Sequence, residues 1–222
     1  DIDGEVLVVD NGSSDGSPEA AAAAGATVVR EPRRGYGAAY LAGFRAARGE
    51  YVIMADADGT YDLAAVPAFL ERLRAGDELV MGSRFRGTIA PGAMPWSHRY
   101  IGSPVLSTLL NLLYGTGVSD AHCGMRAFRR DALERMQLRM PGMEFASEMI
   151  VNAARAGLRI GEVPVDYRAR VGTSKLHSLR DGWRHLRFLF LYSPTHLFLA
   201  PGAALFVIGV ALLVALLPGP RR

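Results

Sequence analysis

Two aspartates, Asp56 and Asp58, stand one residue apart directly after the apolar segment 51–55. In an extended chain, residues i and i+2 project to the same side, so both carboxylates can reach one divalent cation, or a cation and a ribose. Oxygen ligands suit Mg²⁺ or Mn²⁺, and a single cysteine, Cys123, excludes a multi-cysteine metal cluster. Aspartate and glycine at a strand end are also typical of an ordinary turn. The interpretation of the pair as a ligand site therefore depends on the polar loops that accompany it.

Further polar clusters follow other apolar segments. Asp10 and Asn11 begin a loop of short side chains and backbone donors that suits a base and a ribose, or a plain strand-to-helix turn. Gly35 and Gly37 allow a close approach by a ligand or by another part of the backbone. Arg84 follows the next apolar segment. The carboxyl ends of parallel strands meet at one edge of a sheet, so these loops together predict a ligand site.

The elements that must position these loops alternate along the chain. Apolar runs predict strands over residues 5–10, 26–30, 51–55, 78–83 and 159–167. Helical patterns lie over residues 18–24, 36–48, 63–75, 100–114, 131–136 and 144–156, and a Gly- and Pro-rich connection covers residues 86–97. This alternation predicts an α/β fold with a mainly parallel sheet and helices on both faces.

The C-terminal part has a different character. Residues 197–217 are 21 residues without a charge, about 31 Å of helix at about 1.5 Å per residue, which predicts a transmembrane helix. Before them, apolar residues at helical spacing beside arginines predict an amphipathic helix in the membrane interface, or an ordinary surface helix packed on the body. The expected organisation is a catalytic domain over 1–170, a basic juxtamembrane segment over 171–195 and the membrane helix over 196–218.

The charges are unevenly distributed. The chain has a net charge of +3, but residues 168–187 carry +5 and residues 1–167 carry −4. A nucleic-acid-binding protein would spread basic charge over its folded surface, so a membrane partner is favoured and nucleic acid is not expected. Basic residues ahead of the apolar segment favour a cytoplasmic catalytic domain at the cell membrane. The chain starts directly before a strand, from which we expect one earlier strand of the sheet to be missing.

Five motifs in order, VVDNGSSDGS, EPRRGYGAAYLAGFRAARGEYVIMADADGTYD, VMGSRF, DAHCGMRAFRR and GLRIGEVPVDYRARVGTSKLH, resemble family 2 glycosyltransferases of the dolichol-phosphate mannose synthase and bacterial polyprenyl-phosphate glucosyltransferase type. The resemblance runs from about residue 5 to residue 217. It implies a GT-A fold and inverting transfer of a hexose, glucose or mannose, from UDP-glucose or GDP-mannose. The implied acceptor is a polyprenyl phosphate, dolichyl or undecaprenyl, on the cytosolic leaflet.

The resemblance also implies roles for residues. Nucleotide-sugar binding would fall to Asp10, Asn11, Gly35, Gly37 and Asp56, and metal binding to Asp56 and Asp58. Phosphate binding would fall to Arg84, Arg99, Arg170 and Lys175, with Asp58, Arg84 and Arg170 as the catalytic residues. Thr60 departs from the pattern, since some relatives place a metal-reaching amide there.

The chemistry agrees with this assignment. A departing nucleoside diphosphate needs its charge neutralised, and an acceptor phosphate is already an anion, so it needs cationic partners rather than a general base. A hydroxyl acceptor would instead need a carboxylate, for which Glu144 and Glu148 are the candidates. A nucleotidyltransferase, or an inactive membrane-anchored scaffold of the same fold, is the alternative. We expect Cys123 to be a buried small residue and His122 to be a hydrogen-bond donor in a loop.

Overall fold

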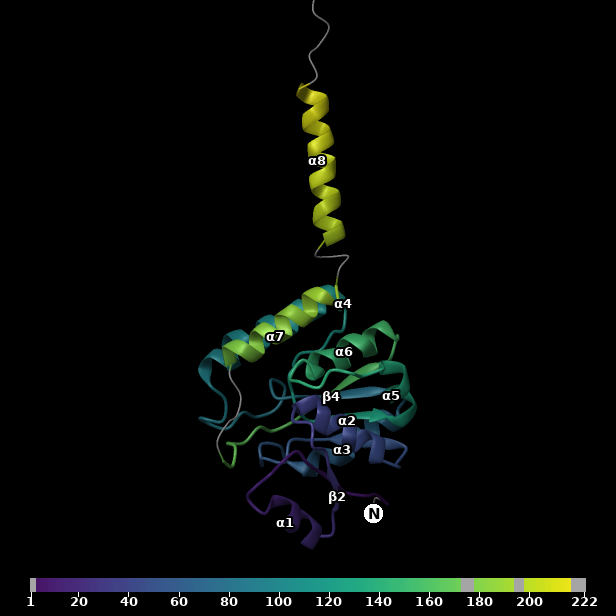
Figure 1. Ribbon diagram of the computed structural model, residues 1–222, viewed down its shortest axis with the longest axis vertical. Coiled ribbons are helices and arrows are strands. Elements are labelled where there is room, and N and C mark those ends of the chain that lie inside the picture. Colours follow the sequence, from purple (N-terminus) through teal and green to yellow (C-terminus); the bar gives the residue numbers. More distant parts are fainter. Residues whose placement is uncertain (1–2, 173–177, 194–197, 217–222) are drawn as a thin grey trace, which may run out of the picture.

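The computed structural model describes residues 3–172, 178–193 and 198–216 (Figure 1). Its first part is a small parallel sheet in which β1 (Leu7–Asp10) pairs in register with β2 (Thr27–Arg30). Helix α1 (Ser17–Ala23) connects the two strands, and α2 (Tyr36–Ala46) packs on β1 and β2. These four elements confirm the alternation that the sequence predicts for this region.

A second sheet of four strands has the order β3-β5-β4-β6. Its strands are β3 (Tyr51–Met54), β4 (Leu79–Ser83), β5 (Arg126–Arg129) and β6 (Ile160–Pro164). Strand β5 runs antiparallel to both β3 and β4, whereas β6 runs parallel to β4. The carboxyl ends of β3, β4 and β6 therefore meet at one edge, as predicted, and the amino end of β5 joins them there.

Two features of the sheet correct the sequence prediction. Among the described residues the strands form two sheets, so the predicted single, mainly parallel sheet is right only in part. The strand β5 was not predicted, because its four residues alternate poorly and include the buried, charged Arg126. Its place in the centre of the sheet depends on long-range pairing rather than on a local pattern.

Helices cover both faces of the larger sheet. One face carries α3 (Val66–Arg74), which follows the short 3₁₀ helix η1 (Leu63–Ala65). The other face carries α4 (Ser103–Tyr114), α5 (Arg130–Met136) and α6 (Phe145–Arg155), with the π-helical turn η2 (His98–Gly102) leading into α4. Strand β4 is buried throughout: Leu79 and Met81 face one helical layer and Val80 faces the other. This alternation accounts for the continuous apolar run in its sequence.

Helix α7 (Ser178–Leu191) packs beside α4 and α6. Its buried side chains are His185, Phe188 and Leu189, whereas Trp183 is exposed. The predicted helix in this region is thus present and it packs on the body. The domain limits at residues 170 and 195 stay a prediction.

Helix α8 (Ala200–Leu216) stands apart from the body in Figure 1 and has 17 residues. Within residues 3–172, 178–193 and 198–216, no helix is both long enough and apolar enough to cross a membrane. The outer residues of the predicted transmembrane helix over 196–218, which are 196–197 and 217–218, lie outside the described residues, and that helix stays a prediction. The helix begins at Ala200 rather than Leu197, and Pro201 occupies its first turn, where a missing N–H is tolerated.

Candidate functional site

The acidic loop after β3 holds Asp56 partly buried against α2. Tyr40 of α2 donates a hydrogen bond from its hydroxyl to Asp56 Oδ1 over 2.9 Å. Burial raises the pKa of the Asp56 carboxyl, and the negative charge of Asp58 raises it further, against the opposing hydrogen bond from Tyr40. A cation at this carboxylate would offset the electrostatic cost of keeping it ionised.

Asp58 uses both carboxylate oxygens within the protein. Its Oδ1 accepts hydrogen bonds from the backbone N–H of Thr60 at 3.1 Å and from the Thr60 hydroxyl at 2.6 Å. Its Oδ2 lies 2.8 Å from Nε of Arg170. Thr60, the residue that departs from the family pattern, therefore orients Asp58 in this structure.

The chain beyond β6 runs along the acidic loop and brings Arg170 there. Val171 N–H donates to the Asp58 carbonyl at 2.9 Å, and Arg168 N–H donates to the Thr60 carbonyl at 2.8 Å. The Arg168 side chain also forms an ion pair with Asp62. We call residues 168–171 the strap. It places one sequence-predicted cationic residue directly on one sequence-predicted metal ligand.

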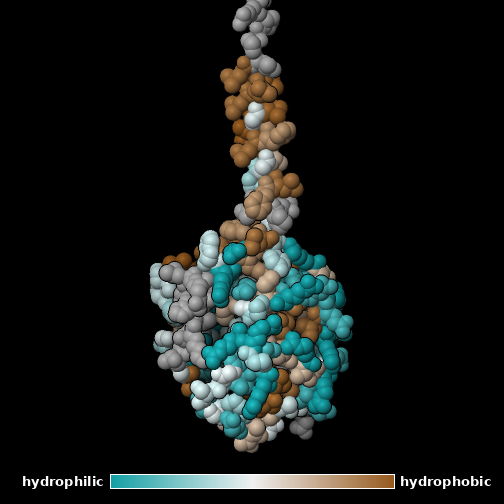
Figure 2. Space-filling view, in the orientation of Figure 1, coloured by the Kyte–Doolittle hydropathy of each residue, from teal (hydrophilic) through white to brown (hydrophobic). Residues whose placement is uncertain are grey.

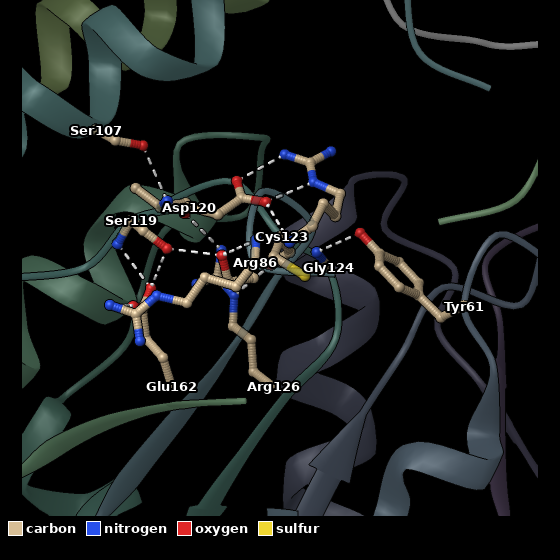
Figure 3. Close-up of polar contacts among 12 residues, drawn as sticks. Tyr61, Arg86, Ser107, Ser119, Asp120, Cys123, Gly124, Arg126 and Glu162 are labelled. Carbon is tan, nitrogen blue, oxygen red and sulfur yellow. Dashed lines mark hydrogen bonds and ion pairs between the residues drawn. The ribbon is translucent and has the colours of Figure 1, made fainter. Parts of the chain in front are cut away.

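The loop before β5, residues 120–124, also approaches the acidic pair, Asp56 and Asp58. Figure 3 shows Asp120, Cys123 and Gly124 of this loop near Tyr61 and Arg126. A Cβ at Gly124 would lie 2.3 Å from Asp56 Oδ2, so only glycine lets this backbone approach the carboxylate. Gly124 N–H donates to the Tyr61 hydroxyl at 2.7 Å. The buried guanidinium of Arg126 supports the loop by donating to the carbonyls of Ala121 and Cys123.

Arg84 is held inside the protein by Asp120. Its Nε lies 2.6 Å from Asp120 Oδ2 and its Nη2 lies 2.8 Å from Asp120 Oδ1, a two-pronged pair in which both residues are buried. The guanidinium also lies 5.2 Å from the centre of the Tyr167 ring. The sequence predicts Arg84 as a phosphate ligand and catalytic residue, whereas here its charge is already matched by a carboxylate. The role in phosphate binding stays a prediction.

At the end of β1, Asp10 and Asn11 have different surroundings. Asp10 accepts a hydrogen bond from Ser13 N–H at 2.8 Å, which lowers the pKa of its carboxyl. It lines a polar hollow of about 440 Å³ with Arg30 of β2. The Asn11 amide instead donates to the carbonyls of Glu31 and Arg33 and accepts from Gly35 N–H. Asn11 therefore ties two loops together, and its role in nucleotide-sugar binding stays a prediction.

The two glycines at the start of α2 are required by packing. A Cβ at Gly35 would lie 2.3 Å from the Pro141 carbonyl oxygen, and one at Gly37 would lie 2.0 Å from the Met140 carbonyl oxygen. The helix N-terminus is also capped from the same loop, since Ala38 N–H donates to the Pro141 carbonyl at 3.0 Å. These contacts agree with the alternative in which the glycines let another part of the backbone approach closely, and their role in nucleotide-sugar binding stays a prediction.

The contacts of the described residues do not join Arg99, a predicted phosphate ligand, to the acidic pair. Arg99 lies in η2 with its guanidinium 5.5 Å from the Tyr100 ring centre, and within the described residues no hydrogen bond or ion pair connects it to Asp58. Lys175 lies outside the described residues. Their contribution to acceptor binding stays a prediction.

The two candidate carboxylates of α6 differ. Buried Glu148 accepts hydrogen bonds from the backbone N–H groups of Arg139 and Met140, and burial raises the pKa of its carboxyl. It therefore holds a loop in place. Glu144 has one buried carboxylate oxygen, Oε2, without a hydrogen-bond partner among the described residues.

The predicted burial of Cys123 is confirmed, and burial raises the pKa of its thiol to about 12. The expectation that His122 donates a hydrogen bond is wrong, since neither ring nitrogen has a partner among the described residues. Its ring instead packs edge-on against His185 of α7, with ring centres 4.5 Å apart.

The donor set fits a hard divalent cation. Among the described residues no group of three or more His, Cys, Asp or Glu side chains could hold a metal ion. The chain therefore offers Asp56 and Asp58, and a cation such as Mg²⁺ or Mn²⁺ would complete its shell with water and with phosphate oxygens of a substrate. Such use of few protein ligands is typical of metal ions bound together with phosphates.

Several residues of the site escaped the sequence prediction. Three of them contact or closely approach a predicted residue from another segment of the chain, namely Tyr40, Asp120 and Gly124. The sequence offered one signal, because the motif around Cys123 includes both Asp120 and Gly124. Their partners could not be assigned without the antiparallel strand β5.

The α/β layers and the acidic loop at the carboxyl ends of β3, β4 and β6 define a protein of the GT-A type. The chain belongs to the family described as Glycosyl transferase family 2, whose profile matches residues 2–137. The family predicted from the motifs is therefore confirmed.

Two curated relatives come from Haloferax volcanii. The low-salt glycan biosynthesis hexosyltransferase Agl6 is 51% identical over 214 residues, which are 96% of this chain and 52% of that protein. A dolichyl-phosphate hexose transferase is 35% identical over 178 residues, 80% of this chain and 76% of that protein. The chain thus spans about half the length of the first of these relatives.

Among solved structures, glucosyl-3-phosphoglycerate synthase from Mycobacterium tuberculosis, in complex with Mn²⁺, UDP and glucosyl-3-phosphoglycerate, matches with a TM-score of 0.65. The match has 22% sequence identity and covers 85% of this chain and 68% of that chain. At this identity the likeness establishes the α/β fold of the GT-A type.

Proposed function

We propose that this protein transfers a hexose from a nucleoside diphosphate sugar to a polyprenyl phosphate, with inversion at the anomeric carbon. The observation that carries the proposal is the juxtaposition of Arg170 with Asp58, 2.8 Å apart, beside Asp56. It puts a cation-binding carboxylate pair and an anion-binding guanidinium at one point of the sheet edge. A reaction between two phosphate-bearing substrates needs both kinds of group together.

The donor side of the site would be formed by the acidic pair and the end of β1. Asp56 and Asp58 would hold Mg²⁺ or Mn²⁺, which, when bound, neutralises charge on the departing diphosphate. Asp10, at the rim of the polar hollow, is the group available for the base or ribose. A solved neighbour that binds Mn²⁺ with UDP-glucose supports a donor of this kind, UDP-glucose or GDP-mannose.

On the acceptor side the strap supplies the cationic groups. A phosphate oxygen is already an anion at neutral pH, so its attack on the sugar requires orientation and charge neutralisation rather than proton removal. Among the described residues, Arg170 can neutralise the charge of the acceptor phosphate. Phosphate binding by Arg84, Arg99 and Lys175 is implied by the resemblance to the family. The relative described as a dolichyl-phosphate hexose transferase supports a lipid phosphate acceptor, dolichyl or undecaprenyl.

The predicted membrane partner, with the catalytic body at the cytoplasmic face, belongs to the same proposal. A lipid phosphate is presented at a bilayer surface, and α7 carries exposed Trp183 beside exposed Arg184 and Arg187. These side chains suit a helix that contacts the interface without crossing it.

A test is transfer of radiolabel from UDP-glucose or GDP-mannose to a C55 polyprenyl phosphate by the full-length protein. We expect a labelled lipid that requires Mg²⁺ or Mn²⁺, and we expect Asp58→Asn to reduce its formation at least about a hundredfold. Asp62→Asn is the matched control, because Asp62 lies in the same loop but pairs with Arg168 and caps η1.

Two results would contradict the proposal. Release of hexose 1-phosphate, with the nucleoside monophosphate attached to the product, would favour the nucleotidyltransferase alternative. Donor binding without any labelled lipid would favour a scaffold that has lost activity.

A hydroxyl acceptor is the second candidate, favoured by one observation, the buried Oε2 of Glu144, which has no hydrogen-bond partner in the part of the chain that the structure describes. A base for hydroxyl transfer requires a free carboxylate oxygen, and Glu148 does not offer one so readily because its carboxylate binds backbone N–H groups. Labelled transfer to glycerol or to a free sugar that is abolished by Glu144→Gln would favour this candidate. Lipid transfer that survives Glu144→Gln would favour the phosphate acceptor.

A further inference from the structure

The outer face of η2 and α4 carries large apolar side chains in contact with solvent. Trp96 is 67% exposed and Leu112 is 77% exposed, and Tyr100, Ile101 and Val105 between them are also exposed. Val105 and Leu112 lie two turns apart on the same side of α4, whereas Ser107 and Leu110 face the body and are buried. We call these five exposed residues the α4 face. An apolar patch of this kind on a folded body marks a surface that contacts something else.

The α4 face continues onto α7. The two helices pack against each other, and Trp183 of α7 is 63% exposed. Helix α8 leaves the body at this same end, and Figure 2 shows hydrophobic residues gathered where it departs. In Figure 1 the N-terminus lies at the opposite end of the body.

The charges of this end are mainly basic. Residues 79–119, which include η2 and α4, contain no Asp or Glu, and neither do residues 182–222. Arg99 lies beside Tyr100, and Arg184 and Arg187 are exposed on α7. By contrast, residues 1–167 as a whole carry a net charge of −4. The α4 segment thus has no carboxylate of its own and α7 has one, Asp181, against several arginines, so this basic and apolar end is complementary to an anionic lipid headgroup region.

We propose that the α4 face, together with Trp183, lies in the headgroup region of an anionic lipid bilayer, so that the body contacts the membrane through two helices side by side. Tryptophan and tyrosine favour this depth because their rings are apolar and their N–H or O–H groups reach water. The inference rests on the proposed function, because a lipid phosphate acceptor requires the protein to approach a lipid surface. Two parallel contacts would fix the tilt of the body relative to the bilayer, which a single apolar helix such as α8 cannot do.

The chain has two tryptophans, Trp96 and Trp183, and each can be observed alone. In Trp183→Phe the remaining emission reports on the α4 face, and in Trp96→Phe it reports on α7. The full chain is mixed with POPC/POPG (3:1) vesicles that contain brominated phosphatidylcholine, without donor or metal. We expect a blue shift and at least twofold quenching of both tryptophans, and weaker quenching in vesicles of POPC alone.

The matched control moves the reporter to the other end of the body. Val6 is 66% exposed and lies near the N-terminus, so Val6→Trp in the Trp96→Phe/Trp183→Phe background should show no quenching. A second variant, Val105→Asp/Leu112→Asp in the Trp183→Phe background, places charges at exposed positions and should abolish quenching of Trp96. Unchanged circular dichroism would show that this variant is folded.

Three outcomes would overturn the inference. Trp96 could stay unquenched while the protein floats with the vesicles, which would mean that α8 binds alone. Quenching could be equal in POPC and POPC/POPG, which would remove the role of anionic lipid. A dimer that shields Trp96 from vesicles would mean that a second copy covers the α4 face. Since none of these measurements involves hexose transfer, failure of the transfer assay leaves their result intact.

Discussion

The guanidinium of Arg170 binds the carboxylate of Asp58, with Nε 2.8 Å from Oδ2. Arg170 is a predicted phosphate ligand and Asp58 is a predicted metal ligand. In this structure the two side chains bind each other in place of the phosphate and the metal ion. Binding of a cation to Asp58 therefore competes with the strap. If Asp58 holds a cation, Arg170 would be available to bind a phosphate.

This competition predicts an unusual effect of removing Arg170. Arg170→Gln should bind Mn²⁺ more tightly than the wild type in the absence of any donor, by about two- to fivefold, because the competing ion pair is partly exposed and weak. The same variant should transfer hexose more slowly. Mn²⁺ affinity is measured by electron paramagnetic resonance of the free ion.

Arg168→Gln is the control for this experiment. Arg168 lies in the same strap but pairs with Asp62, so its loss should leave Mn²⁺ affinity unchanged. Weaker Mn²⁺ binding in Arg170→Gln would mean that Arg170 orients Asp58 for the cation rather than competing with it.

A second prediction concerns the approach of Gly124 to Asp56. Gly124→Ala would place a Cβ 2.3 Å from Asp56 Oδ2, so either the loop or the carboxylate must move. We expect a loss of about 1–3 kcal/mol in the free energy of unfolding, as for other overpacked sites, together with weaker Mn²⁺ binding. Urea unfolding and Mn²⁺ titration of the same samples measure the two effects.

Gly102→Ala serves as the comparison, because a Cβ at Gly102 would make only an ordinary contact, 3.6 Å from the Ser97 carbonyl oxygen. Its stability and Mn²⁺ affinity should match the wild type. A stable Gly124→Ala variant with normal Mn²⁺ affinity would show that Asp56 is not positioned by this loop.

The parts of the fold that local patterns encode were predictable from the sequence. Apolar runs located β1, β2, β3, β4 and β6, and the placement of Asp56 and Asp58 at the carboxyl edge followed from the parallel arrangement of strands, whereas Arg170 was implied by the resemblance alone. The carboxyl end of a strand is a local feature, so the sequence can identify it.

Relations that depend on distant partners were not predictable. Gly37 resembles a ligand-binding glycine, but a side chain there would collide with the carbonyl of Met140, which is more than a hundred residues away in the sequence. Arg84 resembles a free phosphate ligand because Asp120, its partner, is brought to it by β4 and β5. Glycines and arginines serve packing and binding equally well, and residue type alone does not separate the two uses.

Cys123 gives a third prediction. Burial raises the pKa of its thiol to about 12, so at pH 8 only about one molecule in ten thousand carries the reactive thiolate. The folded protein should react with a disulfide reagent such as DTNB at least about a hundredfold more slowly than the urea-unfolded chain. Because the pKa is raised, the rate in the folded state should increase as the pH rises from 7 to 10. Fast labelling at pH 7 would show that the loop 120–124 opens readily.

The last prediction decides between two roles for Arg84. If its task is to neutralise buried Asp120, then Arg84→Met leaves an uncompensated buried carboxylate and should cost about 3–5 kcal/mol of unfolding free energy. The double variant Arg84→Met/Asp120→Leu should recover part of that loss, because no buried charge is left without a partner. Urea unfolding of the two single variants and the double variant completes the cycle, and the exposed pair of Arg129 and Asp131 provides a control cycle with little coupling. If Arg84 instead binds an acceptor phosphate, Arg84→Met should keep the unfolding free energy of the wild type and lose lipid transfer. The double variant should then show no recovery of unfolding free energy.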